Sequence, residues 1–276
     1  MDKILVTGSS GFIGKKIIER LDKLKVITDS NDSEYINLQN REQVMKLDSA
    51  DTVIHLAGKT PQKKLKWSEY FDNNVIGTLN ILEYCIQNKV KKMIYVSSYV
   101  YGNPKYSPIN EKHPINPHNA YTKSKYLAEQ LCEFYAKNSD LNVIILRPFN
   151  IFGKTLPNGF LISNLLKSIQ TNEKVTIFNK DSKRDFLHID DFVDIVLKIK
   201  DCDFKFEVFN VGSGKSYSFN EVVKKIEKIS IKKLNLQYEE DKESFIGEIT
   251  ADISKLNNKI KWVSKISFDE GLQKSK

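Results

Sequence analysis

The stretch Ile4-Leu5-Val6-Thr7-Gly8-Ser9-Ser10-Gly11-Phe12-Ile13-Gly14 joins a short apolar run to three glycines that are spaced three residues apart. After it, Ile17, Ile18 and Leu21 recur at helical spacing, so the pattern predicts a strand, a glycine-rich turn and a helix. Glycines allow a tight turn and let a pyrophosphate approach the backbone, while a helix N-terminus offers unpaired N–H groups to the anion. The stretch therefore predicts the phosphate site of a dinucleotide.

An acidic residue follows the next predicted strand. Lys25 to Thr28 form that strand and Asp29 comes directly after it, at the distance expected for a carboxylate that hydrogen-bonds an adenine ribose diol. A carboxylate there repels a 2′-phosphate, and no lysine or arginine lies between Ser30 and Glu34. We therefore expect NAD rather than NADP. The alternative for Asp29 is an ordinary solvated turn residue.

Strand and helix patterns alternate over the first 150 residues, which predicts an α/β fold, a Rossmann-type doubly wound parallel sheet. After Pro148 the pattern loosens, which indicates a smaller C-terminal substrate-binding subdomain. We expect an NAD-binding Rossmann domain at 1–150, to which 187–212 return, and a mainly substrate-binding subdomain at 151–276.

The expected elements follow from the apolar periodicity. In the first domain they are a short strand at Tyr35 to Leu38, a helix around Arg41 to Leu47, a buried strand at Asp51 to Gly58, a helix from Tyr70 to Asn88, and strands at Met93 to Val96 and Asn142 to Leu146. Beyond it they are helices at Phe160 to Gln170, Asp190 to Lys200 and Phe219 to Lys228, and strands at Lys174 to Phe178 and Glu207 to Val211.

Tyr121 and Lys125 are four residues apart in a predicted helix that Asn119 would cap. At that spacing the two side chains share one face, and a nearby ammonium favours the phenolate form of a tyrosine. The pair is thus a candidate acid/base site, and the alternative is a plain amphipathic helix. The predicted buried stripes are Leu127, Leu131 and Phe134 on this helix, and Val75, Leu79, Leu82 and Ile86 on the preceding one.

Small and polar residues end two of the predicted strands. Ala57 and Gly58 leave room for a flat cofactor at a strand's carboxyl edge, whereas His55 is interpreted as a packed strand residue. Ser97 and Ser98 end the next strand, where a hydroxyl could bind a substrate hydroxyl or carbonyl. Turn chemistry is the alternative for the serines.

Composition restricts the partners. Lysine and arginine exceed aspartate and glutamate by 43 to 35 in 276 residues, but the lysines are scattered and indicate no nucleic-acid groove. The cysteines Cys85, Cys132 and Cys202 are far apart and odd in number, so neither a disulfide scaffold nor a metal cluster is predicted. No apolar run approaches membrane-spanning length and no targeting leader is visible. We therefore expect a cytoplasmic protein without membrane, nucleic-acid or metal partners.

Eight motifs in order resemble the extended short-chain dehydrogenase/reductases, in the NAD-dependent nucleotide-sugar epimerase/dehydratase group that includes UDP-glucose 4-epimerase. The resemblance spans nearly the whole chain. Its landmarks are Thr7 to Gly14, His55 to Gly58, Asn74 to Asn80, Ser97 to Gly102, Tyr121 with Lys125, Arg147 to Gly153, Arg184 to Asp191 and Asn210 to Gly214.

The resemblance implies roles for individual residues. Tyr121 would be the catalytic acid/base, Lys125 would bind the nicotinamide ribose and lower the tyrosine pKa, and Ser98, or alternatively Ser97, would polarise the reacting oxygen. The cofactor would be lined by Gly8, Gly11, Phe12, Ile13, Gly14, Asp29, Leu56, Ala57, Gly58, Asn74, Lys125 and Pro148. A nucleotide-diphosphate sugar would meet Ser98, Tyr121, Asn150 and Arg184. A homodimer through a four-helix interface is also implied.

The implied reaction is C4 epimerisation of a nucleotide sugar through a transient 4-keto intermediate. The alternative is an NAD(P)H-dependent reductase of a nucleotide-4-keto-6-deoxysugar, which the short segment between Thr28 and Asp51 favours. A non-catalytic dinucleotide-binding protein is a third possibility. Tyr99 and Val100 follow Ser98 where dehydratases carry an Asp-Glu pair, so dehydration is not expected. The family's diphosphate-binding arginine before Gly-Asp is replaced here by Phe245 and Ile246 before Gly247-Glu248.

Overall fold

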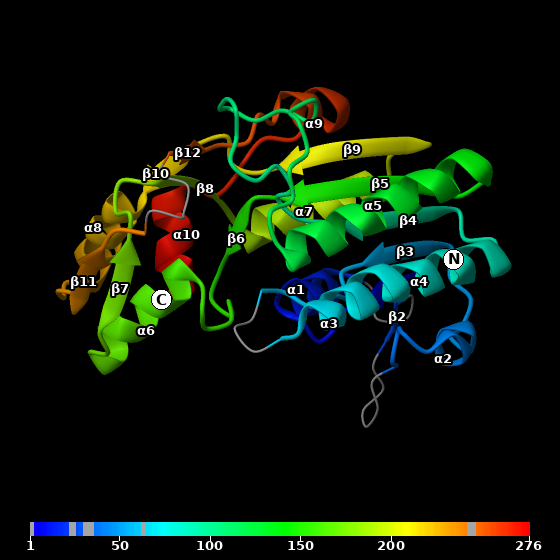
Figure 1. Ribbon diagram of the computed structural model, residues 1–276, viewed down its shortest axis with the longest axis horizontal. Helices are drawn as coiled ribbons and strands as arrows, with labels where there is room; N and C mark the ends of the chain where they lie inside the picture. Colours follow the sequence, from blue (N-terminus) through cyan, green and yellow to red (C-terminus); the bar gives the residue numbers. More distant parts are fainter. Residues whose placement is uncertain (1–2, 22–25, 30–35, 62–64, 242–246) are drawn as a thin grey trace. The chain divides into compact units, whose positions relative to one another are not determined.

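The computed structural model describes residues 3–21, 26–29, 36–61, 65–241 and 247–276. The chain divides into two compact units (Figure 1). The first unit comprises Met1–Gly102, Pro114–Pro148 and Ile195–Phe209, and the second comprises Asn103–His113, Phe149–Asp194 and Asn210–Lys276. The segment 103–113 thus belongs to the second unit, although the sequence pattern assigned it to the first domain.

A six-stranded sheet forms the centre of the first unit, in the order β2-β1-β3-β4-β5-β9. Its strands are β1 (Ile4–Thr7), β2 (Val26–Thr28), β3 (Thr52–His55), β4 (Lys92–Val96), β5 (Asn142–Pro148) and β9 (Phe206–Val211). The pairs β1–β2, β1–β3, β3–β4 and β4–β5 are parallel. The strand order reverses direction at β1 and β3, which is where ligands bind in open α/β sheets. The predicted doubly wound parallel sheet is confirmed.

Helices alternate with these strands along the chain (Figure 1). They are α1 (Phe12–Arg20), α2 (Arg41–Met45), α3 (Trp67–Phe71), the π-helical turn η2 (Asp72–Ile76), α4 (Gly77–Gln87), α5 (Ala120–Asn138) and α7 (Ile189–Lys200). Alternate strand residues, such as Leu5, Val53 and Met93, pack against α4 and α5 in one apolar cluster with Ile81 and Cys132. Burial of this face supplies the main driving force for folding of the unit.

The predicted strand at Tyr35 to Leu38 is wrong where it can be compared. Ile36, Asn37 and Leu38 are not in a strand, and Tyr35 lies outside the described residues. The backbone N–H of Ile36 donates instead to the carbonyl of Asp29 at 2.9 Å. The sheet therefore ends at β2 on this side.

The predicted buried stripes of two helices are also corrected. On α5, Phe134 is 61% exposed and Leu127 and Leu131 are half-buried. On α4, Leu82 is buried as predicted but Ile86 is 41% exposed. The buried residues of α5 are instead small or polar: Thr122, Ser124, Lys125, Ala128, Glu129, Cys132 and Ala136. Small side chains at these positions let the helix lie close to the sheet, which hydrophobicity alone does not reveal.

The second unit contains β6 (Asn150–Phe152), α6 (Leu161–Thr171), β7 (Val175–Phe178), β8 (Lys183–His188), β10 (Ser216–Ser218), α8 (Phe219–Ser230), β11 (Leu236–Glu239), β12 (Glu248–Ile249), α9 (Ser254–Ile260) and α10 (Phe268–Ser275). Strand β8 pairs with β6, β10 and β12, and β7 pairs with β11. The predictions of α6, β7 and α8 are confirmed, whereas β8, β11 and α10 were not predicted. Aromatic residues of three elements, Phe152, Phe186 and Phe268, form the centre of its core.

Within the described part of the chain, no helix combines the length and apolar character that crossing a membrane requires.

Candidate active site

The glycine turn joins β1 to α1 in close contact with the end of β3. Gly8 has a φ of +70°, and a Cβ there would lie 2.7 Å from the backbone nitrogen of Ala57. A Cβ on Gly14 would lie 2.1 Å from the carbonyl oxygen of Gly8. No larger residue fits at Gly8 or Gly14, so the backbone at these two positions carries no side chain. The backbone N–H groups that can meet a pyrophosphate are therefore those of the first turn of α1, which have no partner within the helix.

Asp29 is fastened to this turn. Its carboxylate accepts hydrogen bonds from the Gly8 N–H at 2.5 Å and from the Ser9 N–H at 3.2 Å. The hydroxyl of Ser9 donates to it at 2.7 Å. Asp29 is only 8% exposed, so it is not a solvated turn residue. Its contact with the glycine turn was not predicted from the sequence.

Asn74 links the loop after β3 to helix α5. Its Oδ1 accepts from the Lys59 N–H at 2.7 Å, and its Nδ2 donates to the Ser124 hydroxyl at 2.8 Å. The residue lies in the π-helical turn η2, where the sequence predicted an uninterrupted helix from Tyr70 to Asn88. Such turns interrupt α-helices mostly at functional sites. The predicted cofactor residues Leu56, Ala57 and Gly58 form the loop that this amide holds, and a Cβ on Gly58 would lie 2.7 Å from Asn74 Oδ1.

His55 is a completely buried bridge beside these residues. Its Nδ1 lies 2.6 Å from the Thr7 hydroxyl and its Nε2 lies 2.9 Å from the Thr78 hydroxyl. The Thr78 hydroxyl donates to the carbonyl of Asn74, so it accepts from Nε2–H and leaves Nδ1 to accept from Thr7. Burial, helped by the charge of Lys125, lowers the pKa of His55 to about 3. The imidazole is therefore neutral and structural, in agreement with its interpretation as a packed strand residue, and it also links β1 to α4.

Helix α5 begins where the sequence predicts. Asn119 Oδ1 accepts from the Thr122 N–H at 2.9 Å and caps the helix. Tyr121 therefore lies in the first turn, and Lys125 lies one turn further on.

Ser98 interacts with the phenol of Tyr121, and this interaction lowers the phenol pKa. Burial outweighs it, and the pKa of Tyr121 is raised above its ordinary value. The expectation that Lys125 lowers this pKa is corrected, because desolvation of the phenol dominates. In this state the phenol is protonated at neutral pH.

Lys125 is buried, with 4% of its surface exposed. Its ammonium lies 4.4 Å from the centroid of the Tyr95 ring, which provides a cation–π contact. Burial lowers the pKa of Lys125 to about 8, against an opposing effect of the Glu129 carboxylate. The ammonium of Lys125 therefore loses its proton near pH 8, only slightly above neutral pH.

The two strand-end serines differ in their contacts. Ser98 interacts with the phenol of Tyr121 and lowers its pKa, whereas the Ser97 hydroxyl is buried and finds no hydrogen-bond partner among the described residues. The backbone N–H of Ser97 donates to the Leu146 carbonyl and continues the sheet. This arrangement favours Ser98 as the group that acts with Tyr121.

The remaining predicted residues lie at the end of β5 or in the second unit. Pro148 is buried at the end of β5. Asn150, on β6, donates from Nδ2 to the Asp185 carbonyl at 2.8 Å. Arg184, on β8, donates from Nη1 to the Gly247 carbonyl at 3.1 Å, and its guanidinium lies 5.4 Å from the centre of the Phe219 ring.

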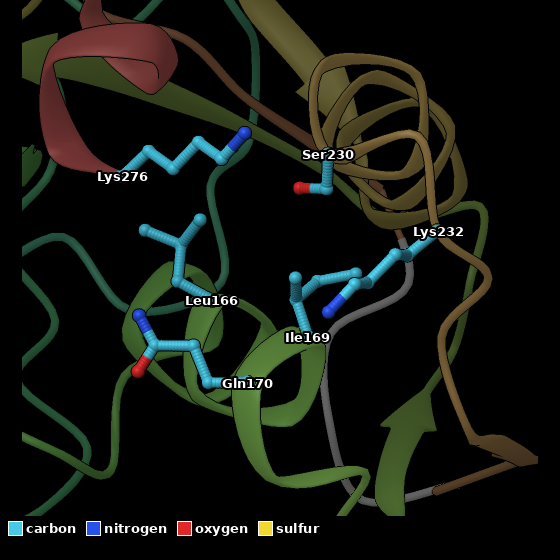
Figure 2. Close-up of a pocket in the computed structure, with 6 residues that line it drawn as sticks. All are labelled: Leu166, Ile169, Gln170, Ser230, Lys232 and Lys276. Carbon is cyan, nitrogen blue, oxygen red and sulfur yellow. The ribbon is translucent and has the colours of Figure 1, made fainter.

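The second unit also holds a cavity of about 240 Å³ that contains none of the predicted residues (Figure 2). It is lined by Leu166, Ile169, Gln170, Ser230, Lys232 and Lys276. Ser230 is the last residue of α8, and the carbonyl groups at a helix C-terminus disfavour an anion. The cavity therefore gives no indication of a phosphate site despite its two lysines.

Comparison with known proteins agrees with these features. Residues 4–212 match the NAD dependent epimerase/dehydratase family. UDP-glucose 4-epimerase 4 of Oryza sativa subsp. japonica is 29% identical over 97% of this chain and 87% of its own.

Two solved structures share the fold. UDP-glucose 4-epimerase of Thermotoga maritima, solved with UDP-glucose, has a TM-score of 0.91 and 27% identity, covering 99% of this chain and 97% of its own. RMD from Pseudomonas aeruginosa, complexed with NADPH, has a TM-score of 0.90 and 25% identity, covering 100% of this chain and 97% of its own. The chain therefore belongs to the NAD-dependent epimerase/dehydratase family, as an NAD-dependent sugar-nucleotide epimerase or oxidoreductase.

Proposed function

We propose that this chain is a nucleotide-sugar C4 epimerase that works with bound NAD through a transient 4-keto sugar. The observation that carries the proposal is that Ser98 acts on the phenol of Tyr121, with Lys125 buried one turn along the same helix. These groups lie in the same unit as the glycine turn and Asp29. A phenol, a hydroxyl and an ammonium are the groups that moving a proton to and from a sugar hydroxyl requires.

Each residue has a defined part in this reaction. Tyr121, as the phenolate, takes the proton of the C4 hydroxyl and later returns it, while Ser98 holds the same oxygen by a hydrogen bond. Lys125, one turn along the helix from Tyr121, binds ribose hydroxyls of the cofactor. Bound NAD supplies the acceptor and donor for the C4 hydride. Because the hydride that C4 loses is returned to C4, the reaction has no net oxidation. Its return to the opposite face inverts C4.

The substrate we propose is a UDP-sugar. The relative from Oryza sativa is named a UDP-glucose 4-epimerase, and the Thermotoga maritima structure holds UDP-glucose. Arg184 is our candidate for the diphosphate, since a guanidinium binds phosphate in a bidentate manner, and Asn150 is our candidate for a sugar hydroxyl.

A second candidate is a reductase of a nucleotide-4-keto sugar. It is favoured by the likeness to RMD, which was solved with NADPH, and by the short segment between Thr28 and Asp51. Here Tyr121 would only donate a proton to the keto oxygen, and its raised pKa suits that direction.

One experiment separates the two functions. The purified protein is incubated with UDP-glucose or UDP-galactose, and the products are followed by proton NMR of the anomeric signals. Interconversion without a change in the absorbance of reduced nicotinamide supports the epimerase. Stoichiometric consumption of NADH or NADPH with a nucleotide-4-keto-6-deoxysugar, and no interconversion, would support the reductase instead.

We further propose a homodimer that forms through α4 and α5. Both helices expose apolar residues on their outer faces, led by Ile86 at 41% and Phe134 at 61%. Val75 in η2 and Leu127 and Leu131 on α5 are half-buried in the same way. An antiparallel pair of such faces would bury these side chains in a four-helix bundle.

A cytoplasmic location fits the three cysteines, all of which are free.

A further inference from the structure

Glu129 and Arg147 form an ion pair inside the first unit. Arg147 Nε donates to the two carboxylate oxygens of Glu129 at 3.0 and 3.1 Å, and Nη2 donates to Oε2 at 2.6 Å. The two residues are only 3% and 6% exposed. Taking both charges out of water is costly, and a well-packed apolar pair is often equally stable or better. The pair therefore calls for an explanation other than stability.

Arg147 connects all the segments that carry the proposed acid/base residues. Through Glu129 it is bound to α5, two turns after Tyr121. Its Nη1 donates to the Tyr101 hydroxyl at 2.9 Å, in the segment that follows the strand-end serines. Pro148 is its direct neighbour in the chain. A planar guanidinium with fixed donor directions is well suited to holding three segments in one geometry.

Glu129 also supplies a negative charge to the surroundings of Lys125. The two side chains are four residues apart on the buried face of α5. Four other titratable side chains interact with Lys125 or lie against it: Tyr121 and Cys132 on α5, Tyr95 on β4 and His55 on β3.

Those four groups are uncharged at neutral pH. Burial raises the pKa of Tyr121, Tyr95 and Cys132, and it lowers the pKa of His55 to about 3. The negative charge that acts on the Lys125 ammonium therefore comes from Glu129, which opposes the desolvation of the lysine.

We propose that the Glu129–Arg147 pair positions the active site: it fixes α5 against the end of β5 and the Tyr101 segment, and it places the Glu129 carboxylate one turn from Lys125 on the same buried face. The inference rests on the proposed function, since it assigns the pair to the Tyr121–Lys125 site. Glu129 and Arg147 are positioning residues because they act through Lys125 and Tyr121.

The test compares Glu129→Gln with the double variant Glu129→Leu/Arg147→Met. Glu129→Gln leaves the buried guanidinium of Arg147 without its carboxylate partner, so this variant should lose both stability and activity. The double variant removes both charges and should recover the wild-type melting temperature to within a few degrees. Its turnover at pH 7.5 should stay at least about tenfold below wild type, and the alkaline limb of its pH–rate profile should move down by about one pH unit or more. Glu133→Gln is the matched control. It removes an exposed carboxylate that lies one turn after Glu129 and pairs with Lys137, and it should leave the pH–rate profile unchanged.

A purely structural role would give a different result. If the double variant regained both the melting temperature and the wild-type pH profile, the assignment to Lys125 would be wrong. NADH affinity measured by fluorescence from pH 6.5 to 10 gives a second readout that needs no turnover. If wild-type protein converts no sugar nucleotide, the proposed function fails. The inference then stands or falls on whether the loss of NADH affinity at high pH begins at lower pH in the double variant.

Discussion

Ser98 acts on the phenol of Tyr121 and lowers its pKa, whereas the hydroxyl of its neighbour Ser97 is buried and has no hydrogen-bond partner among the described residues. Ser98→Ala should therefore lower turnover by about a hundredfold, the usual scale for a group that acts in proton transfer. Ser97→Ala is the matched control, and it should change turnover less than about threefold while leaving stability nearly unchanged, because the lost hydroxyl makes no bond. Steady-state kinetics of both variants decide the assignment. A larger effect from Ser97→Ala would reverse it.

Tyr121→Phe removes the ionisable oxygen and keeps the ring. The ring packs edge-on against Tyr70, with centroids 6.1 Å apart, so the fold should be retained. We expect turnover to fall by at least about a hundredfold, with NADH affinity within about twofold of wild type. Tyr70→Phe provides the control for loss of a neighbouring phenol. Near-normal turnover of Tyr121→Phe would rule out the proposed acid/base role.

The buried Lys125 predicts a defined pH dependence of stability. Its pKa falls from 10.5 to about 8 on folding, because burial penalises the ammonium. Between these values the unfolded chain keeps a proton that the folded chain has lost, so stability rises with pH in this window. Lys125→Met should be more stable than wild type at pH 7, by up to about 3 kcal/mol, and the difference should shrink as the pH approaches 10. Urea unfolding of both proteins at pH 7 and 9.5 measures it.

The same ionisation should limit activity. If the ammonium of Lys125 is needed, turnover falls as the pH rises through about 8. Unfolding does not explain this fall, because the contribution of Lys125 to stability rises over the same pH range. A rate that keeps rising to pH 10 would contradict the need for a charged lysine.

Local patterns predicted the parts of the fold that local chemistry determines. The glycine turn after β1 and the Asn119 cap of α5 each depend on residues within a few positions, so their sequence signals are direct. The buried face of α5 was not predictable in this way. Hydrophobicity favoured Phe134 as a core residue, whereas the close approach of helix and sheet selects Ala128 and Cys132.

The energetics of the candidate site could not be predicted from the sequence. Tyr121 and Lys125 were identified from spacing, yet their pKa values depend on burial, which spacing does not give. The contact of Asp29 with Gly8 and the pairing of Glu129 with Arg147 join residues 21 and 18 positions apart, and only the folded chain shows them.

Asp29 should control the choice of cofactor through both its charge and its contacts. Asp29→Asn weakens the bonds to the Gly8 and Ser9 N–H groups and removes the charge that would repel a 2′-phosphate. We expect the dissociation constant for NADH to rise about tenfold, as for loss of a charge-assisted hydrogen bond, while that for NADPH rises less. Fluorescence titration with both nucleotides measures the ratio. Asp140→Asn, which neutralises an exposed carboxylate in the same unit, is the control, and an unchanged ratio in Asp29→Asn would contradict the role.

The exposed apolar face of α5 leads to a prediction about assembly. Phe134 on α5 is 61% exposed, and Ile86 on α4 of the same unit is 41% exposed. If two copies pack through these helices, Phe134→Lys places a charge at an apolar contact and should shift the protein from dimer to monomer at micromolar concentration. Light scattering coupled to size-exclusion chromatography measures the mass. Ile231→Lys is the matched control, because Ile231 is 92% exposed but lies in the second unit, and it should leave the mass unchanged. A dimer that survives Phe134→Lys would place the interface elsewhere, and a monomeric wild-type protein would exclude the dimer itself.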